Sequence, residues 1–112
     1  MIKGLNDLAK EIHDNAIKHG WWDTQREFPE VIALCHSELS EALEESRMGK
    51  KPTEVYYSKD ATDKPLGVPI ELADAIIRIL DYCSKEGIDI EDAIRIKHEY
   101  NKSRPYRHGK RF

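Results

Sequence analysis

One segment, residues 70–80, restricts what this chain can fold into more than any other. It reads Ile-Glu-Leu-Ala-Asp-Ala-Ile-Ile-Arg-Ile-Leu, and its only polar residues are Glu71, Asp74 and Arg78. At 100° per residue along a helix, these three side chains and Asp81 fall within an arc of about 80°. A helix that is apolar on nearly every other side is normally buried, so we expect the polar stripe to face the interior of the protein or of its assembly.

A second acidic row lies in residues 29–48, where Glu38, Glu41 and Glu45 follow one another at i, i+3 and i+7 beside an apolar arc. If the two helices pack side by side, four carboxylates meet: Glu38, Glu41, Glu71 and Asp74. Like charges about 4 Å apart repel by roughly 4 kcal/mol at an effective dielectric constant near 20, so such a cluster needs protons, lysines or a metal ion. Ligation by oxygen alone favours Mg²⁺, with Mn²⁺ as the alternative.

The plain alternative is that these acids are ordinary helix-surface glutamates. The chain contains 21 acidic residues, and Glu-x-x-Glu is common by chance. An oxygen-activating di-iron site is not expected, because such sites in helical bundles use Glu-x-x-His. None of the five histidines has a glutamate three positions before it.

Apolar periodicity and helix-end residues predict four helices, at about residues 2–18, 29–48, 69–85 and 89–103. Residues 50–68 show no helical period and are predicted to form a loop, with an extended piece at residues 55–57. No convincing strand is expected, and the predicted fold is all-α, a four-helix bundle-like single domain over residues 1–112. A chain of 112 residues buries only about two-thirds of its surface on folding, so we expect a homo-oligomer, either a dimer or a tetramer.

Positive charge is concentrated at the end of the sequence. Residues 94–112 hold seven Lys or Arg and one acid, whereas residues 1–93 hold eleven Lys or Arg and twenty acids. Lys97, Asn101 and Arg104 lie on one helix face, and the basic tail, residues 104–112, continues with Arg107, His108 and Lys110. These donors suit phosphate oxygens. The alternatives are a solvated end and a lysine that simply reaches water; nucleic acid is a rival partner that the acidic body disfavours.

Two adjacent tryptophans, Trp21 and Trp22, follow the expected end of the first helix at His19-Gly20. Either ring could stack on a nucleobase, a contact worth about 1–3 kcal/mol per base in single-strand complexes. His13 and Asn15 on the preceding helix could line the same pocket. The competing interpretation places the tryptophans in the core or in a subunit interface.

Together these motifs resemble those of the MazG-like, all-α nucleoside triphosphate pyrophosphohydrolases. The likeness comprises Glu38-Leu-Ser-Glu41, Glu71-Leu-Ala-Asp74 after 29 intervening residues, His19-Gly-Trp-Trp22, and the segment 97–110. It covers most of the chain outside residues 50–68. The resemblance implies hydrolysis of the α–β phosphoanhydride of a nucleoside triphosphate to a monophosphate and pyrophosphate.

By the same resemblance, Glu38, Glu41, Glu71 and Asp74 would hold one or more Mg²⁺ ions. Many members of the family have a second Glu beside the first motif Glu, where this chain has Ser37, and Glu45 is a candidate substitute. The mechanistic hypothesis is that Glu41 or Glu38 orients a metal-activated water. Lys97 and Arg104, together with Arg78, would then offset the charge of the leaving pyrophosphate.

Two other functions compete with this interpretation: a nonenzymatic helical module that binds phosphate-rich partners or nucleic acid, and an enzyme similar to phosphoribosyl-ATP pyrophosphohydrolase. We expect a cytoplasmic protein, because no segment approaches the ~20 apolar residues of a membrane span and no secretory leader is recognisable. Cys35 and Cys83 lie in helical patterns without CxxC spacing and are expected to be reduced and buried.

Overall fold

The computed structural model describes residues 4–60 and 62–106 of the chain. Its elements are α1 (Leu5–Lys18), α2 (Phe28–Arg47), β1 (Tyr56–Tyr57), β2 (Pro65–Leu66), α3 (Val68–Glu86) and α4 (Ile90–Lys102). All four expected helices are present, so the all-α prediction is confirmed. None of these helices combines the length and apolar character that crossing a bilayer requires.

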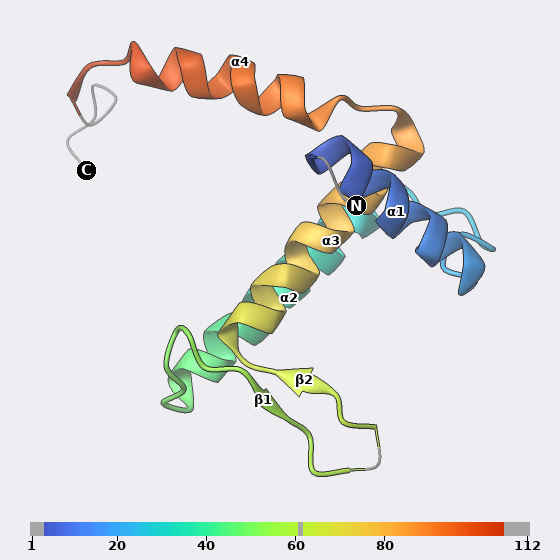
Figure 1. Ribbon diagram of the computed structural model, residues 1–112, viewed down its shortest axis with the longest axis vertical. Helices are drawn as coiled ribbons and strands as arrows, with labels where there is room; N and C mark the ends of the chain where they lie inside the picture. Colours follow the sequence, from blue (N-terminus) through green and yellow to red (C-terminus); the bar gives the residue numbers. More distant parts are fainter. Residues whose placement is uncertain (1–3, 61, 107–112) are drawn as a thin grey trace.

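The long helices α2 and α3 lie side by side and antiparallel, and α1 packs across α3 (Figure 1). Pro29 and Pro69 occupy the first turns of α2 and α3, where a missing backbone N–H does no harm. The core between the helices consists mostly of small side chains: Ala9, Val31, Cys35, Ala42, Ala75, Leu80 and Cys83. Both cysteines are buried and free, as expected, and burial raises the pKa of each thiol.

Residues 50–68 differ from the prediction because they include a short antiparallel hairpin. Tyr56 pairs with Leu66 and Tyr57 with Pro65, so the extended piece is confirmed and the expectation of no strand is wrong. Gly67 joins β2 to α3 with a φ of 125°, and a Cβ there would lie 2.3 Å from the Glu54 carbonyl oxygen. Only glycine fits this close approach, which fixes the hairpin against the start of α3.

The expected four-helix bundle does not form within one chain, because α4 stands apart. It starts at the end of the α2–α3 pair opposite the hairpin and extends to one side, with few contacts other than those to α1 (Figure 1). Asn6 of α1 accepts a hydrogen bond from Ile90 N and donates one to the Asp89 carboxylate. Asp89 in turn accepts from Asp92 N as the helix N-cap. This contact holds only the first turn of α4.

Candidate metal centre

A cavity of about 430 Å³ opens between α1, α2 and α3. Its lining includes five carboxylates and two cations: Glu38 and Glu41 from α2, Glu71, Asp74, Arg78 and Asp81 from α3, and Lys64 from the hairpin. The whole polar stripe predicted for α3 therefore faces this one cavity, and so do the first two acids of the row on α2.

Three of the carboxylates are close enough to share an ion. Glu38, Glu71 and Asp74 each offer an oxygen atom, and these atoms lie within 4.8 Å of one another. Glu71 is only 5% exposed, whereas Glu38 and Asp74 are half-buried. Glu41 lines the same cavity from an exposed position. The four predicted metal ligands thus share one cavity, and three of them form its compact centre.

The carboxylates disfavour one another's charge. Burial, reinforced by the charges of Glu41, Asp74 and Glu38, raises the pKa of Glu71 to about 7. Burial and Glu38 also raise the pKa of Asp74, while Arg78 and Lys64 oppose that rise. No lysine or arginine among residues 4–60 and 62–106 lies within ion-pair distance of Glu71. A divalent cation with oxygen ligands would relieve this repulsion, so the donors present fit Mg²⁺ or Mn²⁺.

Arg78 is already engaged by its neighbours. Its Nε donates to Glu38 Oε1 at 3.1 Å, one terminal nitrogen forms an ion pair with the same oxygen at 3.0 Å, and its guanidinium lies 4.8 Å from the Trp21 ring centroid. Arg26 lies closer, at 3.6 Å over the same ring, and its Nε donates to the Trp21 carbonyl. Trp21 lines the cavity, but a nucleobase stacking on its ring would compete with these guanidinium groups.

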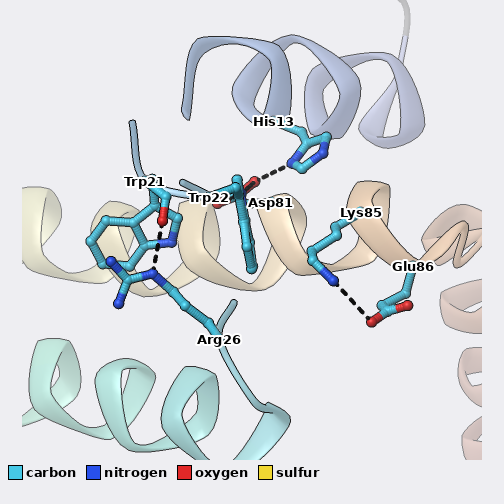
Figure 2. Close-up of polar contacts among 7 residues, drawn as sticks. All are labelled: His13, Trp21, Trp22, Arg26, Asp81, Lys85 and Glu86. Carbon is cyan, nitrogen blue, oxygen red and sulfur yellow. Dashed lines mark hydrogen bonds and ion pairs between the residues drawn. The ribbon is translucent and has the colours of Figure 1, made fainter. Parts of the chain in front are cut away.

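Asp81, at the edge of the cavity, is the shared acceptor of a second group of polar contacts (Figure 2). Its buried carboxylate accepts from His13 Nδ1 at 2.7 Å and from Trp22 Nε1 at 3.0 and 3.1 Å. Lys85 lies 5.1 Å from the Trp22 ring centroid. His13 and Trp22 do not line the cavity, whereas Asn15 does. Through His13 and Trp22, this group of contacts ties α1 and the turn after it to α3.

The phosphate-binding residues predicted on α4 and just after it are not brought to the cavity. Lys97, Asn101 and Arg104 are absent from its lining, because α4 begins beyond the end of α3 that is remote from Glu71 (Figure 1). Lys97 and Arg104 lie instead 4.8 and 5.6 Å from the ring centroid of Tyr100. The expected arrangement of a metal site beside a basic arm is therefore not formed within one chain. The tail residues Arg107, His108 and Lys110 lie outside the described residues.

Glu45, the candidate substitute for the ligand missing at Ser37, faces the hairpin. Its buried carboxylate accepts from the Tyr56 hydroxyl at 2.6 and 2.9 Å. This hydrogen bond raises the pKa of Tyr56 to about 12, so the hydroxyl stays protonated as a donor. Glu45 is not part of the triad, and its contact with Tyr56 holds the hairpin on α2.

Sequence reasoning missed Lys64 as a site residue. It falls within residues 50–68, where neither periodicity nor a recognisable motif marks it, and only the hairpin brings it to the cavity. Asp81 belonged to the predicted stripe, but its partners His13 and Trp22 come from segments more than 50 residues away.

Fold and site together define a small helical protein with a carboxylate-lined cavity between three helices. Neither a protein-family model, nor a curated protein, nor a solved structure matches this chain. The resemblance to the MazG-like enzymes therefore remains a prediction that depends on the residues themselves.

Proposed function

We propose that this protein is a Mg²⁺-dependent nucleoside triphosphate pyrophosphohydrolase that releases a nucleoside monophosphate and pyrophosphate. One observation carries the proposal: Glu38, Glu71 and Asp74, taken from two helices, offer carboxylate oxygens within 4.8 Å of one another in a cavity of about 430 Å³. A cavity of this size falls within the range of small-ligand sites. The motifs that resemble the MazG-like family contain all three residues.

In this proposal, Glu38, Glu71 and Asp74 hold the metal, with Mn²⁺ as an alternative to Mg²⁺. The chemistry that such an ion supplies is neutralisation of the triphosphate and a lower pKa for bound water, which favours attack at the α-phosphorus. Glu41, which lines the cavity outside the compact triad, orients the attacking water and accepts its proton. Arg78, held by Glu38, supplies positive charge beside the phosphates.

The nucleoside is proposed to lie on the α1 side of the cavity, where Asn15 and Trp21 are part of the lining. Asn15 can both donate and accept hydrogen bonds, and it lies on an exposed surface of α1. Trp21 offers a ring face once a guanidinium moves aside. His13 and Trp22 support this wall indirectly through Asp81.

A homo-oligomer is part of the proposal, because the chain exposes apolar stripes. Leu72, Ile76 and Ile79 of α3 are 44%, 54% and 44% exposed, and they lie roughly 150° around the helix from the acidic stripe. Leu39 and Leu43 form a similar stripe on α2. Exposed apolar stripes on neighbouring helices are typical of subunit interfaces. A partner chain could also bring Lys97 and Asn101 of its α4, and Arg104 just after that helix, close to this cavity.

One observation favours a second function, a nonenzymatic helical module that binds phosphate-rich partners. The basic residues of α4 are separate from the carboxylate cavity within one chain, so they could bind an anion independently of it. This alternative predicts phosphate binding that does not depend on Glu71 or Asp74, and no release of pyrophosphate.

The test is a panel of canonical and modified nucleoside triphosphates, with phosphoribosyl-ATP included, incubated with the protein and Mg²⁺. Products are separated to distinguish monophosphate and pyrophosphate from diphosphate and phosphate. We expect the first pair, at a rate that Glu41→Gln lowers by about 100-fold or more, in keeping with loss of a catalytic base. Glu44→Gln, at an exposed position on the same helix, is the matched control and keeps full activity. An inactive wild type across the panel, or an active Glu41→Gln variant, would defeat the proposal.

A further inference from the structure

The hairpin between α2 and α3 is attached firmly at both ends. On the α2 side, the Tyr56 hydroxyl donates to both oxygens of the buried Glu45 carboxylate. On the α3 side, Gly67 packs against the Glu54 carbonyl, and its own carbonyl accepts from Ile70 N and Glu71 N. The hairpin is therefore fixed directly to the helix that carries Glu71 and Asp74.

The turn of the hairpin sets the position of Lys64. Ser58 N donates to the Lys64 carbonyl at 2.8 Å, which closes the turn just before β2. Asp60 accepts from the backbone N–H of Thr62, and Asp63 adopts a left-handed φ of 50° that turns the chain back. Lys64 then follows on the side of the hairpin nearest the cavity and is part of its lining.

Lys64 is the cavity cation that remains available for a ligand. Arg78, the other cation in the lining, is bound to Glu38. Within residues 4–60 and 62–106, the structure gives Lys64 no side-chain hydrogen bond and no ion pair within 4 Å, although its charge acts on Asp74. A lysine on a fixed turn, beside three carboxylates that suit a divalent ion, lies where the anion accompanying that ion would bind.

We propose that Lys64 binds a phosphate oxygen of a metal-bound polyphosphate, so that the hairpin forms one wall of the anion site. This inference rests on the proposed function, and it adds to Arg78 a second cavity cation, one with no ion pair of its own among the described residues, that contacts the polyphosphate. The ammonium group has three donors and reaches phosphate as a point charge. The competing interpretation is that Lys64 only balances the negative charge of Asp74 and its neighbours.

The two interpretations differ in a binding experiment that does not require turnover. Inorganic tripolyphosphate is titrated by calorimetry into the full-length protein with saturating Mn²⁺, and Mn²⁺ is titrated alone in parallel. The variants are Lys64→Ala, Lys64→Arg, and the matched control Lys59→Ala, which removes an exposed charge from the same hairpin outside the cavity lining.

We expect Lys64→Ala to weaken tripolyphosphate binding about tenfold, which corresponds to the loss of one partly exposed charged contact. Lys64→Arg should restore most of the affinity, and Lys59→Ala should match the wild type. Three results would overturn the inference: wild-type affinity in Lys64→Ala, an equal loss in Lys59→Ala, or a Lys64→Ala effect confined to tighter Mn²⁺ binding. The last result would show that Lys64 only balances the negative charge of the carboxylates.

The same samples separate this inference from the proposed function. If the wild type binds tripolyphosphate through Lys64 but leaves every nucleoside triphosphate intact, the anion site at Lys64 stands and the proposed enzymatic activity is refuted. If the wild type releases pyrophosphate and Lys64→Ala does so with the same rate and KM, the proposed enzymatic activity stands and the proposed role of Lys64 is refuted.

Discussion

The substitution Glu71→Gln tests the electrostatics of the cavity, because Glu71 is the most buried carboxylate of the triad. Burial and its acidic neighbours raise its pKa from 4.5 to about 7. Since the folded protein holds this proton more tightly than the unfolded chain, the stabilisation is complete below about pH 4.5 and is lost as the pH rises through about 7. At 1.36 kcal/mol per pKa unit, the upper limit of the loss is roughly 3 kcal/mol, and we expect about 2 because the cavity admits water.

Glutamine resembles the protonated carboxyl group and cannot ionise. In metal-free buffer, Glu71→Gln should therefore raise the free energy of unfolding by about 2 kcal/mol at pH 8 and change it little at pH 4.5. Adding Mg²⁺ at pH 8 should make the wild type more stable than Glu71→Gln, because only the wild-type triad gains the full stabilisation from bound metal.

Urea unfolding at both pH values, with chelator and with Mg²⁺, measures these differences, and Glu44→Gln, at an exposed position outside the cavity lining, serves as the matched control. A Glu71→Gln variant that is no more stable than the wild type at pH 8 without metal would refute the reasoning about repulsion in the cavity.

Three further substitutions probe the supports of the site. Asp81→Ala should lower the free energy of unfolding by about 2–4 kcal/mol, because the Trp22 indole and the His13 imidazole lose their hydrogen-bond acceptor. Urea unfolding followed by Trp fluorescence measures this loss, and an unfolding midpoint equal to that of the wild type would contradict it. Gly67→Ala should cost at least about 2 kcal/mol, since its Cβ would collide with the Glu54 carbonyl; an unchanged midpoint would show that the hairpin is not fixed there. The proposed homo-oligomer predicts a wild-type molar mass above that of one chain in light scattering, and Ile76→Glu, at a position 54% exposed, should lower it to the mass of one chain; an oligomeric wild type with an equally oligomeric variant would exclude this face from the interface.

The acidic site was largely predictable because two constraints coincide in α3. The apolar residues of this helix favour burial, within the chain or against a partner, and its few polar residues then share one direction, which leaves Glu71 and Asp74 little freedom. The row on α2 follows the same period, so Glu38 could be expected beside them. The ends of the helices were predictable from Pro29, Pro69 and the Asp89 cap for similar local reasons.

The remaining features depend on contacts that no local pattern contains. The strands of the hairpin are two residues long, too short for an alternating pattern, so Lys64 could not be placed at the cavity. The position of α4 relative to the other helices could not be predicted from the sequence either. Its apolar residues Ile90, Ala93 and Ile94 follow a helical period, but the same period serves packing within one chain or against another, and Ile94 is 47% exposed here.

Joint binding of a divalent ion by Glu38, Glu71 and Asp74 can be measured directly. Mn²⁺ titration, followed by the electron paramagnetic resonance of free Mn²⁺, counts the bound ions and gives their affinity in the wild type, Asp74→Asn and Glu44→Gln. We expect saturable binding in the wild type, a loss of affinity of at least about tenfold in Asp74→Asn, and no change in Glu44→Gln. A wild type that binds no Mn²⁺, or an Asp74→Asn variant that binds it equally well, would contradict the central claim.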